Sequence, residues 1–92
     1  DIPGEVIGKW RSDKSLMGAA LIMYKGEDDK LFMQTNFKSG NPMTEELSES
    51  SSNGLKRYDY ENTHGEYYLI EKNGNLGMYD SDGKYDEAVK ID

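Results

Sequence analysis

The stretch that decides the fold is Glu66–Asp86, EYYLIEKNGNLGMYDSDGKYD. Side chains in Glu66–Lys72 alternate between two faces, with Tyr68 and Ile70 together on one of them, which is the period of a β-strand. Asn73-Gly74 follows, and this dipeptide is the strongest short-range signal for a tight turn between antiparallel strands. A further strand and a second turn complete the stretch, so the sequence predicts consecutive antiparallel hairpins.

The same two-residue period recurs along the rest of the chain. The segments that it predicts as strands are Glu5–Asp13, Leu16–Lys25, Lys30–Lys38, Gly54–Glu61 and Lys84–Ile91. We expect Val6, Gly8 and Trp10 to share one face of the first strand. In the last strand we expect Tyr85 and Val89 to be the anchors.

Asn41–Glu49, NPMTEELSE, has two interpretations. Asn before Pro and the position of Thr44 suit the start of a short helix. Met43, Glu45 and Leu47 also alternate as in a strand, and the turn-forming run that follows suits a hairpin. We favour the strand.

Turn signals recur every 8 to 14 residues, which is typical of short antiparallel strands in sequence order. Closure of such a meander hides its edge strands. The sequence therefore predicts an all-β fold: one domain over residues 1–92, an antiparallel up-and-down meander of seven or eight strands that closes into a small barrel or a strongly bent sheet.

The charge of the chain restricts its partners. With 18 acidic against 11 basic residues the net charge is −7. Affinity for nucleic acid comes mainly from neutralising phosphates with Lys and Arg, so we expect no nucleic acid partner. Anionic membranes are disfavoured for the same reason. A basic protein partner is favoured instead.

The sequence also bears on location. It has no cysteine, which excludes disulfides and thiolate chemistry. Its longest apolar run, Gly18–Tyr24, is too short to span a bilayer. The chain begins at Asp1, which we interpret as a processed N-terminus. We expect a secreted or periplasmic monomer, derived from a signal-bearing or lipid-anchored precursor.

Gly8-Lys9-Trp10 resembles the Gly-x-Trp that opens the barrel of lipocalins and their calycin relatives. In that family the Trp closes one end of the barrel, and the resemblance implies a carrier of an apolar ligand with Trp10 beside it. Eight strands in 92 residues are short, however, and an eight-stranded barrel has room for side chains or for one small ligand. We expect Trp10, Phe32, Phe37, several of the tyrosines and the five methionines to fill the interior, which places function on the outside or at the rim.

Asp80, Asp82 and Asp86 have the alternating acids of a calcium loop. A helix-loop-helix calcium site requires a third oxygen ligand before its Gly and a Glu six residues later. Gly83 comes one residue after Asp82, and Lys84 lies among the would-be ligands. We therefore predict a hairpin turn, with calcium as the alternative and no metal or cofactor expected.

Catalysis has little support in the sequence. His64, the only histidine, lies in a short polar segment without the signature of a nucleophile or triad. Paired carboxylates need a substrate cleft, for which a small barrel offers little room. We expect no enzyme activity.

Tyrosines alternate with acidic residues over Gly54–Lys72. Tyrosine supplies large, stiff contact area with a polar tip, which suits binding surfaces. Cross-strand aromatic pairs that only stabilise the sheet are the alternative. We predict a non-enzymatic, inhibitor- or immunity-like module that docks an acidic, tyrosine-rich face on a basic protein. The residues predicted to form this face are Tyr58, Tyr60, Tyr67, Asp59, Glu61 and Glu66.

Overall fold

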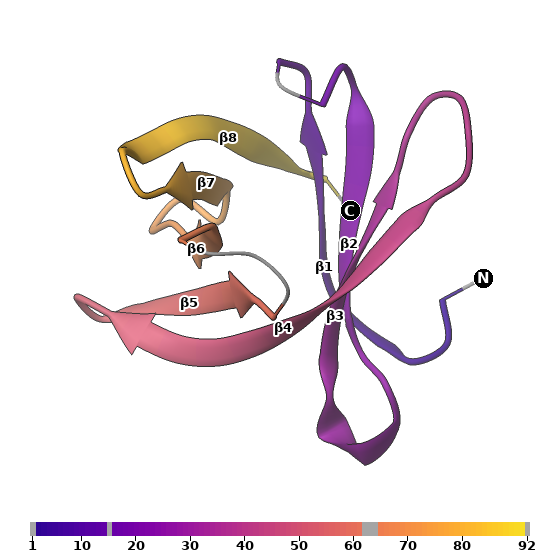
Figure 1. Cartoon of the computed structure of the whole chain (residues 1–92), viewed down its shortest axis with the longest axis horizontal. Coiled ribbons are helices and arrows are strands. Elements are labelled where there is room, and N and C mark those ends of the chain that lie inside the picture. Colours follow the sequence, from indigo (N-terminus) through magenta and orange to yellow (C-terminus); the bar gives the residue numbers. More distant parts are fainter. Residues whose placement is uncertain (1, 15, 62–64, 92) are drawn as a thin grey trace.

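The computed structural model describes residues 2–14, 16–61 and 65–91, and it consists of eight strands. They are β1 (Glu5–Ser12), β2 (Ala19–Lys25), β3 (Leu31–Asn36), β4 (Met43–Ser52), β5 (Leu55–Tyr60), β6 (Tyr67–Ile70), β7 (Leu76–Asp80) and β8 (Gly83–Ile91). Each strand pairs antiparallel with the next, and β8 pairs back with β1, so the sheet closes into one barrel (Figure 1). The predicted all-β barrel is confirmed.

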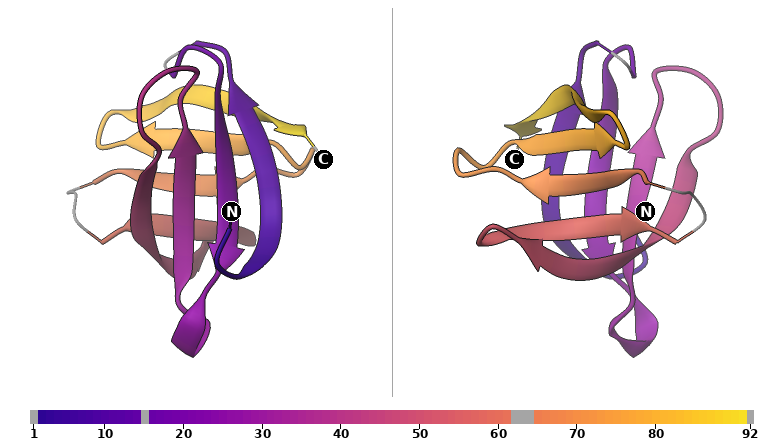
Figure 2. Two further views of the ribbon diagram at one scale, coloured as in Figure 1. Left: turned by 90° about the vertical axis from the view of Figure 1, so that its right-hand side faces the viewer. Right: turned by 60° about the vertical axis from the view of Figure 1, so that its left-hand side comes forward.

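The barrel is flattened into two layers. Strands β1 to β3 and the first half of β4 form one layer, and β5 to β8 cross behind it (Figure 2). The long β4 bends from one layer into the other (Figure 1). Within the described residues the only helix is a three-residue 3-10 turn, Glu27–Asp29, and no helix is long and apolar enough to cross a membrane.

Inward side chains from all eight strands fill the space between the layers. The largest are Trp10, Tyr58 and Tyr68, each at most 2% exposed. The rest of the core cluster consists of Leu21, Met23, Leu31, Met33, Leu47, Leu76, Met78 and Ala88. Aromatic and methionine side chains therefore occupy much of the interior, as the sequence predicts. Met17, Met43 and Phe37, which were also expected inside, are exposed instead.

The Gly-x-Trp of β1 has a packing reason. Residues two apart on a strand point to the same face, and the Trp10 ring lies back over Gly8. A Cβ added to Gly8 would lie 2.5 Å from Trp10 Cη2. The Trp10 indole Nε1 also donates a hydrogen bond of 2.8 Å to the Gly74 carbonyl oxygen, which ties β1 to the hairpin between β6 and β7.

The predictions that Val6 of β1 and that Tyr85 and Val89 of β8 point inward are wrong, because each of these two strands carries a β-bulge. The register of β1 against β2 shifts between Val6 and Gly8, and Val6 is left 41% exposed. In β8 the register skips Tyr85, which is 45% exposed. A bulge inserts one unpaired residue and reverses the alternation beyond it. Inward positions of β8 are consequently Asp86 and Ala88, and Val89 is exposed.

The segment with two interpretations follows the strand, and the predicted Asn73-Gly74 turn forms. Asn41–Glu49 contributes to β4, with Leu47 buried opposite Leu31. The Asn73-Gly74 turn connects β6 and β7, with the Asn73 side chain accepting a 2.9 Å hydrogen bond from the Asn75 N–H. Gly74 has a φ of +89°, a conformation that favours glycine.

Candidate functional site

The predicted tyrosine-and-carboxylate face is divided by the barrel wall. Tyr58 and Tyr68 are paired neighbours on β5 and β6 that point inward, whereas the neighbouring pair Asp59 and Tyr67 lies on the outer face. Tyr58 is 1% exposed, and its hydroxyl donates to Glu49 Oε2 at 2.8 Å. Burial raises the pKa of Tyr58 well above its usual range. Tyr58 belongs to the core and offers no outer contact surface.

Tyr67 lies in an aromatic stack on the outer face of β5, β6 and β7. The Arg57 guanidinium carbon is 3.7 Å from the Tyr67 ring centroid, and the Tyr79 ring is stacked on it at 5.1 Å. Arg57 also donates two 2.9 Å hydrogen bonds to the Asp59 carboxylate. The hydrogen bond to Asp59 is the main reason why the pKa of Arg57 is raised. Asp59 and Tyr67 therefore already have partners within the chain.

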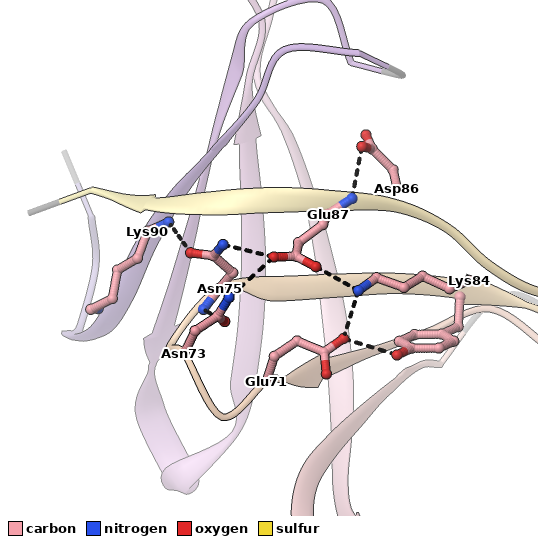
Figure 3. Close-up of polar contacts among 8 residues, drawn as sticks. Glu71, Asn73, Asn75, Lys84, Asp86, Glu87 and Lys90 are labelled. Carbon is pink, nitrogen blue, oxygen red and sulfur yellow. Dashed lines mark hydrogen bonds and ion pairs between the residues drawn. The ribbon is translucent and has the colours of Figure 1, made fainter.

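This paired network continues towards β8, as Figure 3 shows. Glu71 accepts a hydrogen bond from the Tyr79 hydroxyl and forms an ion pair with Lys84, whose Nζ lies 3.2 Å from Glu71 Oε2. Lys84 also contacts Glu87 at 2.5 Å, and the Asn75 amide donates to Glu87 at 2.7 Å. The bond from Lys84, then that from Asn75, lowers the pKa of Glu87 to about 2. The charges of this face are compensated internally.

A second group of acidic and tyrosine side chains lies where β5 and β7 end and where β6 and β8 begin. We name it the acidic rim and define it by Glu45, Tyr60, Glu66, Asp80 and Tyr85. Within the described residues no ion pair joins its carboxylates to a basic side chain. The acidic rim is thus the part of this surface where negative charge is uncompensated.

The pKa values indicate that the ionisable groups of the acidic rim interact electrostatically. Burial, and then the charge of Glu66, raises the pKa of Glu45 above its usual range. Burial, followed by the charge of Glu45, raises the pKa of Tyr60 far above that of an ordinary tyrosine. For Tyr85 the causes are burial and then the carboxylates of Glu66 and Asp80. Like charges that disfavour ionisation in this way create a site that a cation would stabilise.

The backbone explains how the acidic rim assembles. Tyr60 is opposite Leu47 in the register of β4 and β5, and Glu45 is two residues before Leu47 in β4, on the same inward side. The Tyr60 N–H donates to the Glu66 carbonyl, which brings the start of β6 alongside. The β8 bulge turns Tyr85 outward.

Sequence reasoning identified Tyr60 and Glu66 but missed Glu45, and it assigned Tyr85 to the core. The available signal for Glu45 was a carboxylate two residues from Leu47, on the face that a strand buries. Glu61, the remaining predicted residue, is exposed beside this region, where its carboxylate accepts a hydrogen bond from Ser48.

The other candidates are placed as follows. Asp80 Oδ1 accepts a 2.9 Å hydrogen bond from the Asp82 N–H, and Gly83 has a φ of +114°, so Asp80–Gly83 forms the predicted turn. Asp86 points into the barrel, away from this turn, and accepts a hydrogen bond from Ser12. The described residues contain no group of three His, Cys, Asp or Glu placed to hold a metal ion.

His64 lies outside the described residues. Trp10, the residue of the carrier alternative, is 2% exposed and packed within the filled core.

Comparison with known proteins gives no family. No family model, no curated protein and no solved structure matches this chain. The functional argument therefore depends on the site alone.

Proposed function

We propose that this protein is a non-enzymatic binding module that docks its acidic rim on a basic protein. The observation that carries the proposal is the uncompensated cluster of Glu45, Glu66 and Asp80 around Tyr60 and Tyr85. A Lys or Arg side chain of a partner would relieve the repulsion among these carboxylates, and Tyr85 would supply an exposed aromatic contact. A filled barrel interior supports a surface function over the transport of an apolar ligand.

The proposal changes which residues should be mutated. Tyr58→Ala would remove a core side chain at a cost of about 3–5 kcal/mol, which would confuse a binding defect with unfolding. Glu45→Gln with Glu66→Gln removes two rim charges and keeps the shape of both side chains. A matched control is Glu5→Gln with Glu27→Gln, because both residues are exposed and lie at β1 and at the turn after β2. Both double variants change the net charge from −7 to −5.

The test is affinity capture with three baits: wild type, rim variant and control variant. We expect a stoichiometric basic protein on the wild-type and control columns that salt elutes, because salt screens surface charge. The rim variant should bind the isolated protein about two- to thirtyfold more weakly, since it loses two exposed ion pairs and each contributes about 0.2–1 kcal/mol. Equal retention by all three baits would refute the acidic rim as the docking surface.

The raised pKa of Glu45 gives a second readout. A cationic partner favours the ionised carboxylate, so binding should release a proton near the pKa of Glu45 and weaken as the pH falls through it. Glu45→Gln should reduce this pH dependence, whereas Glu5→Gln should leave it unchanged.

A further inference from the structure

The end of the barrel formed by the β1–β2 and β3–β4 loops has the opposite chemistry to the acidic rim. These two loops lie at the same end of the barrel (Figure 2). An open groove of about 420 Å³ lies beside β8, and an apolar groove of ≈ 360 Å³ lies between the loops themselves. The second groove is lined by Leu16, Met17, Phe37, Lys38 and Ser39. We name Met17 and Phe37, with Lys14 and Lys38, the loop tip.

Met17 is presented to solvent by a defined backbone. It is 81% exposed and has a φ of +55°, a region that non-glycine side chains seldom adopt. The Met17 N–H donates to the Lys14 carbonyl at 3.2 Å, and the Gly18 N–H donates to the Ser12 carbonyl at 2.6 Å. The loop is thus hydrogen-bonded in a form that directs a large apolar side chain outward. Strained conformations of this kind concentrate at functional sites.

The charge at this end is locally positive. Arg11, Lys14 and Lys38 are three cations against one acid, Asp13. Within the described residues none of the three cations forms an ion pair. The next acids, in the groove beside β8, are Asp86, which accepts from Ser12, and Glu87, which pairs with Lys84.

The net charge of −7 does not cancel this local charge at a surface in contact with it. The molecule extends 33 × 32 × 26 Å, whereas charges are screened beyond about 8 Å at physiological ionic strength. A surface that touches the loop tip therefore experiences mainly the cations around it. The expectation from composition alone, that anionic membranes are disfavoured, does not apply to this end.

We propose that the loop tip docks on an anionic lipid bilayer. Met17 and Phe37, which are both exposed, would enter the boundary between headgroups and acyl chains, whereas Leu16 packs against the core behind them. The long stems of Lys14 and Lys38 would let their ammonium groups reach lipid phosphates. Charge complementarity favours an anionic surface. Exposed apolar side chains flanked by lysines favour a bilayer, because its surface places anionic phosphates directly above an apolar interior.

The test is sedimentation with phosphatidylcholine vesicles made with and without phosphatidylglycerol. We expect binding only to the vesicles with phosphatidylglycerol. Lys14→Gln with Lys38→Gln should lower the partition coefficient about 30-fold, since each basic residue near an anionic surface contributes a factor of about five. Met17→Ser should weaken binding without changing its salt dependence.

The matched control is Lys25→Gln with Lys30→Gln, at the opposite end of β2 and beyond it. Both double lysine variants carry a net charge of −9, so a difference between them reports position and not total charge. Absence of wild-type binding to phosphatidylglycerol vesicles would overturn the proposal and leave the loop tip to a protein. Equal losses in the two double variants would overturn it as well. Neither result bears on the acidic rim, whose test uses different residues and a protein partner.

Discussion

Ser12→Ala should measure what a buried carboxylate contributes to this barrel. Ser12 is fully buried, and its hydroxyl donates a 2.6 Å hydrogen bond to Asp86 Oδ2, joining β1 to β8 across the closure of the sheet. Asp86 is 8% exposed and also accepts from the Glu87 N–H at 2.7 Å. The substitution removes one oxygen atom and leaves the packing of the surrounding core in place.

The expected loss follows from the type of bond. A hydrogen bond to a charged group contributes about 1.5–3 kcal/mol, so we expect Ser12→Ala to lower the free energy of unfolding by about 2 kcal/mol. For a domain of this size each kcal/mol corresponds to about 4–8 °C, which gives a fall in Tm of about 8–16 °C.

Urea denaturation followed by the fluorescence of Trp10 measures this loss, because Trp10 is the only tryptophan and is buried. An unchanged m-value would show that the native and unfolded states are the same as in wild type. Ser48→Ala is the matched control: it removes a serine hydroxyl that donates to the Glu61 carboxylate on the exposed surface. We expect it to cost less than about 0.5 kcal/mol. If Ser12→Ala lowered the free energy of unfolding as little as Ser48→Ala, burial of Asp86 would not strengthen its hydrogen bond with Ser12.

Three titrations test the remaining electrostatics. Because burial, and then the charge of Glu66, raises the folded-state pKa of Glu45 above that of an ordinary glutamate, the folded protein loses stability as the pH rises from the ordinary value towards the raised one. Glu45→Gln should remove this loss and be more stable than wild type at pH 7 in urea denaturation. Glu87 has the opposite sign: its pKa of about 2 gives stability above pH 4.5 that is lost as the pH falls towards 2. Glu87→Gln should therefore be less stable at pH 7 and lose less on acidification. In alkali, tyrosinate absorbance should show a late phase that coincides with unfolding, because burial raises the pKa values of Tyr58 and Tyr60; a single phase at the pKa of free tyrosine would contradict this.

The sequence was sufficient for the fold because the strands are defined locally. Alternation of side chains and Gly-containing turns predicted the order, direction and closure of the strands. The bulges in β1 and β8 were not predictable in this way, since each depends on how a neighbouring strand pairs. Each bulge reversed an assignment of faces, and this is why Tyr85 was expected inside.

The site was less predictable than the fold. Sequence alternation separated Tyr58 from Asp59, but it did not indicate which of the two faces of β5 would be covered. Nor did it reveal that Asp59 has a partner in Arg57, while Glu66 forms no ion pair within the described part of the chain. Compensation of charge is a property of three-dimensional neighbours. Counts of charge along the sequence do not contain it.

The distribution of charge connects the two proposals. Arg57, Lys84 and the acids that they contact neutralise one another on the outer face of β5 to β8, so these residues contribute little to the field that an approaching partner experiences. The acidic rim remains a negative region, and the loop tip a positive, apolar one. The net charge of −7 describes neither region, because each acts over a distance shorter than the molecule. A protein with this charge distribution would contact an anionic bilayer through the loop tip and a basic partner through the acidic rim. Charge substitutions at the loop tip should consequently leave binding at the acidic rim unchanged.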